Sequence, residues 1–375
     1  MNRIYFDNAA TTSIDPEVVS AMMPFLTEKF GNPSSIYSYG RENRLAVEAS
    51  RKSIASILNA HPSEIFFTSG GTESNNTAIC GAVRDLGCTR IISSRIEHHA
   101  VSHTVEHYHK QGLAKAEYVP VLPNGHLDID ALEKMLESSS EKTLVSLMHA
   151  NNEIGVMLDI KRVGELCKKH NAYFHSDTVQ TVGHFPIDLK ETHVHFITAA
   201  AHKFHGPKGI GMLYINRDVQ IQPFLFGGGQ ERNMRAGTEN IYGIVGLAKA
   251  LELATERYEN DRRSIIALKE YMRESLSAHM PGVTFNGDSG EQGLYTVLSV
   301  NFPSSEKTEM MLFNLDINHI CASSGSACSS GADAGSHVLQ EIPSAKGMQT
   351  IRFSFSRHNT KEEVDQLIEV LKQIL

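Results

Sequence analysis

Two short segments place a carboxylate and a lysine directly after strand-like runs. Asp177 follows residues 172–175, and Lys203 follows residues 195–198. A carboxylate that keeps a pyridine nitrogen protonated and a lysine that bonds to an aldehyde are the groups that pyridoxal phosphate requires. Lys203 is a better candidate than Lys208, because Lys203 ends an apolar run whereas Lys208 lies in a Gly-Pro-Lys-Gly turn. Either motif by itself is better explained as a surface residue.

A glycine-rich turn supplies a third part of such a site. The strand-like residues 65–68 run into Ser-Gly-Gly-Thr and then into the helix-like residues 77–83. Two glycines let the backbone approach an anion at a helix N-terminus, where free N–H groups and the helix dipole favour a phosphate. The turn is not a Walker sequence, because no lysine follows its second glycine. Alone it fits a simple strand-to-helix connection equally well, but together with Asp177 and Lys203 it predicts a pyridoxal-phosphate site.

These residues must be positioned by alternating strands and helices. Such a βαβ rhythm predicts a mostly parallel sheet with helices on its faces and ligand sites at the carboxyl ends of its strands. A long helical pattern over residues 241–280 then leads into a smaller α+β region. We expect a large cofactor-binding domain over residues 14–255 and a small domain over residues 1–13 and 256–375. The expected strands of the large, seven-stranded sheet are residues 65–68, 90–93, 116–121, 143–148, 172–175, 195–198 and 210–215.

The composition excludes several classes of protein. The 375 residues carry 35 Lys and Arg against 43 Asp and Glu, a net charge of −8, so no basic field exists to hold a nucleic acid as the main ligand. No apolar run approaches the ~18 residues of a membrane span, and the first residues show no signal-like pattern, so we expect a cytoplasmic protein. The cysteines are odd in number and lack CxxC spacing, which favours reduced thiols over disulfides or a metal cage. They are Cys80, Cys88, Cys167, Cys321 and Cys328.

A series of motifs, from the first strand to the last helix, resembles that of the cysteine desulfurases of the class V aminotransferase type. The resemblance implies a pyridoxal-phosphate enzyme of fold type I that is a homodimer with its active site at the subunit interface. The motifs are DNAATT at residues 7–12, GNPSS at 31–35, TSGGTESN at 68–75, NNEIG at 151–155, the Asp177 and Lys203 motifs, GGGQER at 227–232, RAGT at 235–238 and SSGSAC at 323–328.

The resemblance also implies how the phosphate of pyridoxal 5'-phosphate is held. Gly71, Thr72 and His202 would bind it, together with Thr238 from the second subunit. The chain departs from the family at Ala200, where a serine or threonine is usual, so one phosphate hydrogen bond is missing or replaced.

The ring of the cofactor is assigned its own residues by the same resemblance. Asp177 would pair with the ring nitrogen, Gln180 and Asn152 would contact the side of the ring hydroxyl, and His98 would stack on the ring. Lys203 would bond to the aldehyde and then act as a base. Because imidazole titrates near neutrality, His98 is also the candidate proton carrier.

Substrate binding and sulfur transfer fall to the C-terminal part of the chain. Arg352, together with Asn152, would bind the substrate, since a guanidinium suits a carboxylate. Residues 323–336 are Gly, Ala or Ser apart from Cys328 and Asp333, a composition that predicts a mobile loop carrying one thiol. The resemblance makes Cys328 the residue that accepts sulfur. A second departure, Tyr37 in place of a histidine, changes the expected contacts at the substrate entrance.

A histidine series at i, i+4 and i+8 is the remaining pattern. His99, His103 and His107 would lie along one face of a helix and could suggest a metal site. Charged neighbours such as Glu106 and Lys110 favour a solvated polar face instead, and we predict no metal.

The activity implied by the resemblance is conversion of L-cysteine to L-alanine, with the sulfur left as a persulfide on Cys328. A sulfur-acceptor protein would then take the sulfur for iron–sulfur cluster assembly or other thiolation. Alternatives are a selenocysteine lyase, another class V enzyme such as a small-amino-acid aminotransferase, and a sulfur-relay partner without enzyme activity. Cys328 disfavours a plain aminotransferase but does not distinguish sulfur from selenium.

Overall fold

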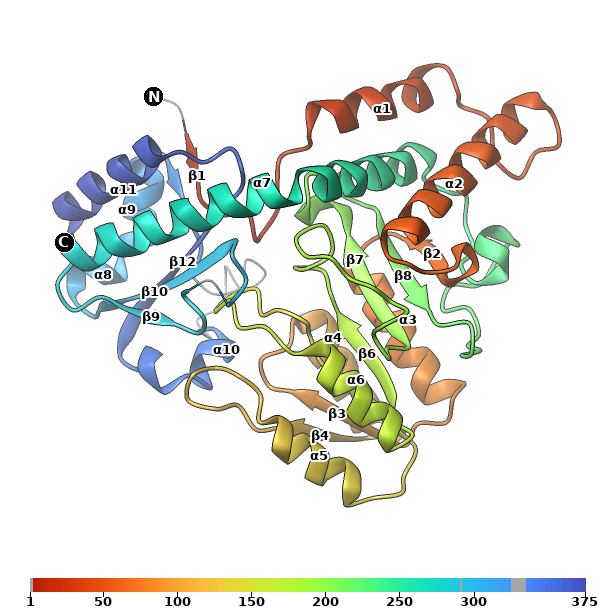
Figure 1. Ribbon diagram of the computed structural model, residues 1–375, viewed down its shortest axis with the longest axis horizontal. Coiled ribbons are helices and arrows are strands. Elements are labelled where there is room, and N and C mark those ends of the chain that lie inside the picture. Colours follow the sequence, from red (N-terminus) through yellow and green to blue (C-terminus); the bar gives the residue numbers. More distant parts are fainter. Residues whose placement is uncertain (1–2, 291, 325–334) are drawn as a thin grey trace.

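A seven-stranded sheet lies at the centre of the larger part of the molecule (Figure 1). In this computed structural model, which describes residues 3–290, 292–324 and 335–375, the strand order is β2-β8-β7-β6-β5-β3-β4. All neighbouring pairs are parallel except those of β8, which runs antiparallel to β2 and β7. The predicted mostly parallel sheet of seven strands is therefore confirmed. The strands are β2 (Ile65–Thr68), β3 (Arg90–Ser94), β4 (Lys115–Val119), β5 (Thr143–Ser146), β6 (Tyr173–Asp177), β7 (Phe196–Ala200) and β8 (Gly211–Ile215).

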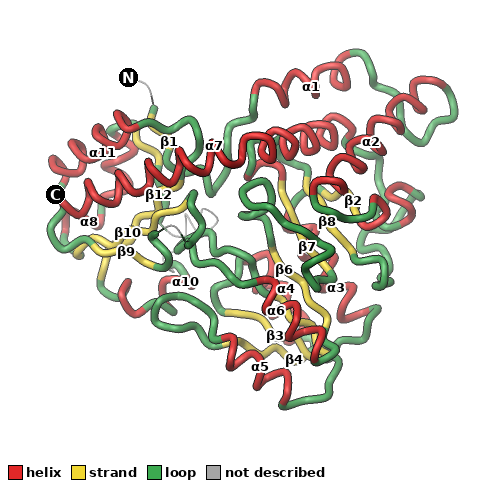
Figure 2. The backbone as a smooth tube through the Cα atoms, viewed as in Figure 1, coloured by secondary structure: helices red, strands yellow, loops and turns green. Residues whose placement is uncertain are grey.

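Helices cover both faces of this sheet, so the larger part has three layers (Figure 2). On one face, Phe174 and Ile197 pack in a hydrophobic core with α1, α2, α5, α6 and the first half of α7. On the other face, Leu144 and Phe196 pack with α3 and α4. Side chains alternate between the two faces along each strand, which is why central strands such as β7 are buried throughout. The helices are α1 (Pro16–Thr27), α2 (Ser38–Ile57), α3 (Gly71–Arg84), α4 (His99–Lys110), α5 (Ile129–Glu137), α6 (Ile160–Lys169) and α7 (Ile241–His279).

The C-terminal residues form a smaller α+β part around an antiparallel sheet of order β12-β10-β9. The N-terminal strand β1 pairs in parallel with β11 beside it, so both termini lie in this part (Figure 1). Its elements are β1 (Ile4–Tyr5), β9 (Thr284–Asn286), β10 (Val297–Pro303), α8 (Glu306–Glu309), α9 (Met311–Ile317), β11 (Ile320–Cys321), α10 (His337–Gln340), β12 (Met348–Ser354) and α11 (Lys361–Ile374).

Helix α7 joins the two parts. Its first half buries Ile244, Leu247 and Leu251 against the large core, and its second half buries Met272 and Leu276 against the small one. None of the helices in the described ranges combines the length and the apolar character that a bilayer-spanning segment requires.

Candidate active site

A cavity of about 230 Å³ opens at the carboxyl ends of the central strands. Connections that follow β2, β3, β5, β6 and β7 all contribute to it, as expected for a parallel sheet. The structure brings together in this cavity every predicted site residue except Thr238 and Cys328. These residues are Gly71, Thr72, His98, Asn152, Asp177, Gln180, His202, Lys203 and Arg352.

The glycine-rich turn forms the start of α3. Helix α3 begins at Gly71, earlier than its apolar pattern indicated, and the preceding Gly70 has a φ of 155° that glycine adopts readily. A Cβ atom on Gly71 would lie 2.7 Å from Cγ2 of Val179, so only glycine fits there. The N–H groups of the first turn of a helix have no partner within the helix and point out of its N-terminal end. The turn therefore presents backbone donors to an anion, with Thr72 and Ala200 beside it on the cavity wall.

Asp177, the last residue of β6, is held by two donors. Its Oδ1 accepts a hydrogen bond from the Val179 N–H (3.0 Å), and its Oδ2 accepts one from Nδ2 of Asn75 (2.7 Å). Only 6% of Asp177 and 1% of Asn75 are exposed. We did not predict Asn75 as a site residue, although it lies within the motif at residues 68–75. Its position on the second turn of α3, facing the sheet, is the signal that could have identified it.

Lys203 follows β7 and reaches the cavity beside the N-terminal segment. Its Nζ donates hydrogen bonds to the backbone oxygens of Ala9 (2.6 Å) and Ala10 (3.0 Å). Nε2 of Gln180 also donates to the Ala9 oxygen (3.1 Å). Burial and the neighbouring Lys203 and Lys208 ammonium groups lower the pKa of His202 to about 4, so His202 is neutral near pH 7.

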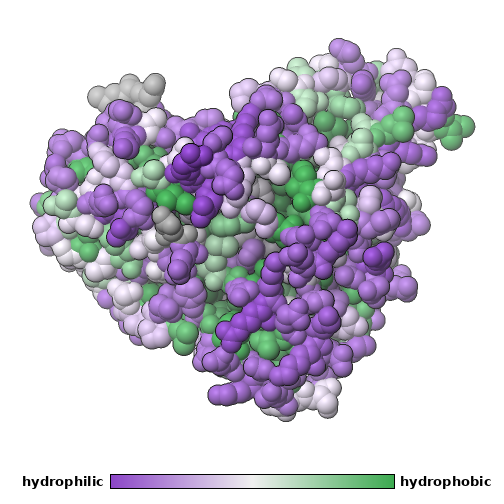
Figure 3. All heavy atoms as spheres, in the orientation of Figure 1, coloured by the Kyte–Doolittle hydropathy of each residue, from purple (hydrophilic) through white to green (hydrophobic). Residues whose placement is uncertain are grey.

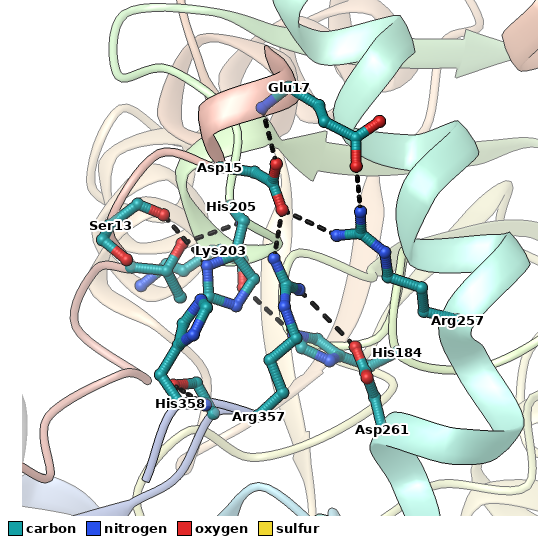
Figure 4. A network of polar contacts seen from close by, with 12 residues as sticks. Ser13, Asp15, Glu17, His184, Lys203, His205, Arg257, Asp261, Arg357 and His358 are labelled. Atoms are coloured by element: carbon teal, nitrogen blue, oxygen red, sulfur yellow. Dashed lines mark hydrogen bonds and ion pairs between the residues drawn. The ribbon is translucent and has the colours of Figure 1, made fainter. Parts of the chain in front are cut away.

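The backbone around Lys203 is fixed from behind by a polar network (Figure 4). The oxygen of Lys203 accepts a hydrogen bond from Nε2 of His184 (3.0 Å), and Nδ1 of His205 donates to the Ser13 oxygen (2.9 Å). Asp15 caps the N-terminus of α1 and forms ion pairs with two arginine side chains in the same network. These contacts connect the backbone around Lys203 with the N-terminal segment and with both parts of the fold.

His98 caps the N-terminus of α4. Its Nδ1 accepts a hydrogen bond from the Ala100 N–H (3.1 Å), so the proton of the neutral ring lies on Nε2. Burial is the main cause that lowers the pKa of His98; Lys203 lowers it further, and Asp177 opposes the shift. The ring therefore offers an Nε2–H donor near neutral pH.

Arg352 lies in the centre of β12 and brings the small part to the cavity. Its side chain is 2% exposed, and it donates hydrogen bonds to Oδ1 of Asp7 (2.7 Å) and to the Asn152 oxygen (3.0 Å). Its Nε is buried and finds no hydrogen-bond partner among the described residues. The guanidinium thus retains a buried donor for a ligand.

Two of the predicted residues are not in the cavity. Thr238 lines a separate pocket with Thr68, Glu231 and Arg235 at the end of β2. Cys328 lies outside the described residues. The predicted histidine series lies on α4 as expected, with the rings of His99 and His103 stacked at 4.5 Å.

The donor set of the cavity fits pyridoxal 5'-phosphate. The helix N-terminus at Gly71 offers partners for a phosphate, Asp177 offers a carboxylate for a ring nitrogen, and Lys203 offers an amine for an aldehyde.

Comparison with known sequences gives matches over nearly the whole chain. The model of the family "Aminotransferase class-V" matches residues 4–367. Cysteine desulfurase IscS of Clostridium botulinum is 43% identical, with 100% of this chain and 95% of the relative covered. Cysteine desulfurase IscS of Methanosarcina thermophila is 44% identical, with 99% and 92% covered.

Comparison with solved structures indicates the same family as the sequence matches. A NifS-like protein superimposes with a TM-score of 0.92 at 36% identity and covers 100% of this chain and 99% of its own. The apo structure of cysteine desulfurase from Thermococcus onnurineus NA1 gives 0.87 at 26% identity, with 99% and 94% covered. The fold is therefore that of the fold-type I pyridoxal-phosphate enzymes, as predicted. The chain belongs to the aminotransferase class-V family and, within it, to the pyridoxal-phosphate-dependent cysteine desulfurases.

Proposed function

We propose that this protein converts L-cysteine to L-alanine and passes the sulfur to its own Cys328. The reaction balances as L-cysteine plus the Cys328 thiol giving L-alanine plus the Cys328 persulfide, so no external oxidant or reductant is needed. The observation that carries the proposal is the meeting of Lys203, Asp177 and Arg352 on one cavity, in a chain 43% identical to cysteine desulfurases. A relative whose structure is titled "SspA in complex with cysteine" supports the choice of substrate.

The cofactor is held, in this proposal, by groups from five strand ends. Gly71, Thr72 and His202 would bind the phosphate, and the Asp177 carboxylate would accept a hydrogen bond from the protonated ring nitrogen. The His98 ring would stack on the cofactor, while Gln180 and Asn152 would contact its hydroxyl side; all of these residues line the cavity. When bound, pyridoxal 5'-phosphate withdraws electrons from the substrate carbons and so weakens the bonds to the α-proton and to sulfur.

Proton movement is assigned to Lys203 and His98. The Lys203 amine would bond to the aldehyde of the cofactor and, once free, would act as the base that removes the α-proton of the substrate. The Lys203 Nζ lies 2.6 and 3.0 Å from the backbone oxygens of Ala9 and Ala10, and hydrogen bonds to these oxygens would orient the lone pair of the free amine in the cavity. His98 is neutral near pH 7 and carries its proton on Nε2, so it donates a proton and later recovers it.

Arg352 binds the substrate carboxylate, and Cys328 takes the sulfur. The guanidinium is already oriented by Asp7 and the Asn152 oxygen, which reduces the entropy lost on binding. The Cys328 thiolate would form a bond to the substrate sulfur while the carbon–sulfur bond breaks. The electron pair of the broken carbon–sulfur bond would stay with the carbon fragment. That fragment takes up protons and leaves as alanine.

We also propose a homodimer in which Thr238 completes the partner's cavity. Within one chain Thr238 lines a different pocket, so it cannot reach the cavity of its own subunit without rearrangement. Large hydrophobic side chains are exposed in the connection between α1 and α2 and on α2 itself, where Phe30, Ile36 and Leu45 are 75%, 87% and 70% exposed. Figure 3 shows hydrophobic residues among hydrophilic ones at this end of the molecule. A second copy of this chain would cover such a surface. Sedimentation of the purified protein tests this: a monomer at micromolar concentration contradicts it.

The remaining assignments follow from the same proposal. The two hydrophobic cores support a boundary near residue 255 within α7, with residues 1–13 joined to the small domain. A sulfur-acceptor protein, such as an iron–sulfur scaffold, would receive the sulfur in the cytoplasm.

Alanine formation tests the activity. Purified holoenzyme with L-cysteine and a thiol reductant should form alanine and sulfide in equal amounts. Cys328→Ser should lose both products while retaining the visible absorbance of the bound cofactor. Cys88→Ser is the matched control, because Cys88 is buried in a core remote from the cavity. Equal rates for wild type and Cys328→Ser would contradict the assigned role.

A further inference from the structure

We propose that His175 is a positioning residue that fixes the orientation of the Asn75 amide and thereby keeps the Asp177 carboxylate ionised for its pairing with the ring nitrogen of the cofactor. The inference rests on the proposed function for the role of Asp177. It concerns side chains behind the cavity rather than on its wall.

A continuous chain of side-chain hydrogen bonds runs from β5 to Asp177. Oγ of Ser146 lies 2.8 Å from Nδ1 of His175, and Nε2 of His175 lies 3.0 Å from Oδ1 of Asn75. Nδ2 of Asn75 then lies 2.7 Å from Oδ2 of Asp177. Thr198 adds a second contact, with its Oγ1 2.9 Å from Oδ1 of Asn75. Strand pairing sets these positions, since Ser146 is opposite His175 in the sheet and Asp177 is opposite Thr198.

The direction of every proton in this chain follows from its last member. An ionised carboxylate can only accept, so the amide nitrogen of Asn75 must face Asp177 and its oxygen must face His175. Nε2 of His175 therefore carries the ring proton, and Nδ1 accepts from the Ser146 hydroxyl. Burial lowers the pKa of His175 to about 4, which keeps the ring in this neutral form near pH 7.

The donor groups of Ser146, His175 and Asn75 are therefore dipoles whose positive ends all point toward Asp177. Ser146, His175 and Asn75 are each 0–1% exposed, so water does not compete with these bonds. Hydrogen bonds to the charged form of a carboxylate favour that form, and bonds in a chain strengthen one another. The chain of donors would therefore hold the proton shared by Asp177 and the cofactor on the ring nitrogen.

Without His175 the Asn75 amide loses one of two donors to its oxygen. It could then rotate and turn that oxygen toward the Asp177 carboxylate, which would repel it. Glu97 and His98 also interact electrostatically with Asp177. Both would be unchanged by a substitution at position 175, so the pH response of a variant can be compared directly with the wild type.

The test compares two substitutions of His175 that differ in one donor. In His175→Gln, the amide nitrogen is the same number of bonds from Cβ as Nε2, so the donor to Asn75 is kept. In His175→Leu, the donor is lost at similar volume. Ser93→Ala is the control, because Ser93 is fully buried and its Oγ donates to the Ser146 backbone oxygen (3.0 Å). This bond is not one of the side-chain hydrogen bonds that lead to Asp177.

The first readout is the pH midpoint of the visible absorbance of the bound cofactor, recorded without L-cysteine. With less stabilisation, Asp177 takes a larger share of the proton and the ring loses positive charge. The Lys203 nitrogen joined to the cofactor should then lose its proton at higher pH. We expect an upward shift of about half a pH unit or more in His175→Leu, and little change in His175→Gln and Ser93→Ala. An unmoved midpoint in folded His175→Leu holoenzyme overturns the proposal.

The second readout is the His175 ring in nitrogen-15-labelled wild-type holoenzyme, identified by its absence in His175→Gln. We expect an Nε2–H tautomer that does not titrate between pH 6 and 8, whereas an Nδ1–H tautomer or titration near pH 6.5 overturns the proposal. This measurement stands even if His175→Leu does not fold. A protein that gives both expected results but forms no alanine refutes the proposed function and leaves this inference intact.

Discussion

Substitution of Arg352 by lysine tests the substrate site, and the contacts of Arg352 allow the expected fall in kcat/KM to be calculated. Arg352 uses separate guanidinium nitrogens for Asp7 and for the Asn152 oxygen, and its buried Nε has no partner in the described part of the chain. A lysine ammonium cannot keep the ion pair with Asp7 and also offer the same forked donors to a substrate carboxylate. One charge-assisted hydrogen bond, about 1.5–3 kcal/mol, is lost. Since 1.4 kcal/mol is a factor of ten, kcat/KM should fall roughly 10- to 150-fold.

The assay is the initial rate of alanine formation over a range of L-cysteine concentrations. Most of the loss should fall in KM, because the contact is made in the bound ground state as well as during the reaction. Arg90→Lys is a matched control: Arg90 is also 2% exposed, is paired with Glu117, donates to a backbone oxygen and has one buried nitrogen without a partner among the described residues. Arg90 does not line the cavity. A normal KM in Arg352→Lys, or an equal loss in both variants, would refute the reasoning.

Three further outcomes follow from other parts of the structure. Gly71→Ala should weaken cofactor retention, because its Cβ would lie 2.7 Å from Cγ2 of Val179, and Val179→Ala in the same chain should restore it; dialysis followed by absorbance measures both. Glu231→Gln should lower the free energy of unfolding in urea by about 3 kcal/mol, since the 2%-exposed Arg51 guanidinium loses its buried partner and keeps only the partly exposed Glu48, and replacing Arg51 and Glu231 by methionine should recover most of the loss. Burial lowers the pKa of His149 from 6.5 to about 4, so the unfolded state binds the proton first and the free energy of unfolding falls as pH drops from about 6.5 toward 4; in His149→Gln this fall should be shallower, as thermal melting across that range would show.

The strands were predictable because central parallel strands are apolar on both faces. The runs that became β6 and β7 end at Asp177 and three residues before Lys203, so the sequence alone placed both groups at one edge of the sheet. Helix α3 was expected to start at residue 77, but it starts at Gly71, because its first turn faces the cavity and carries polar residues without an apolar period. Residues 306–317 form two short helices, α8 and α9, that are separated at Met310.

Contacts between residues far apart in the chain could not be predicted from the sequence pattern. The oxygens of Ala9 and Ala10 meet Lys203 across more than 190 positions, and no local periodicity signals such an approach. The same holds for His175, which appears in sequence as one residue of a buried strand. Its function as a link between Ser146 and Asn75 depends on the strand register, which only the folded chain shows.

Formation of a persulfide in a single turnover tests the central claim most directly. Holoenzyme without reductant should be mixed with L-cysteine, and both free alanine and the mass of the peptide that contains Cys328 should be measured. The account predicts one alanine for each active site, together with a gain of one sulfur atom on Cys328 that a reductant removes. Alanine without sulfur on Cys328, or sulfur on another cysteine such as Cys321, would contradict it.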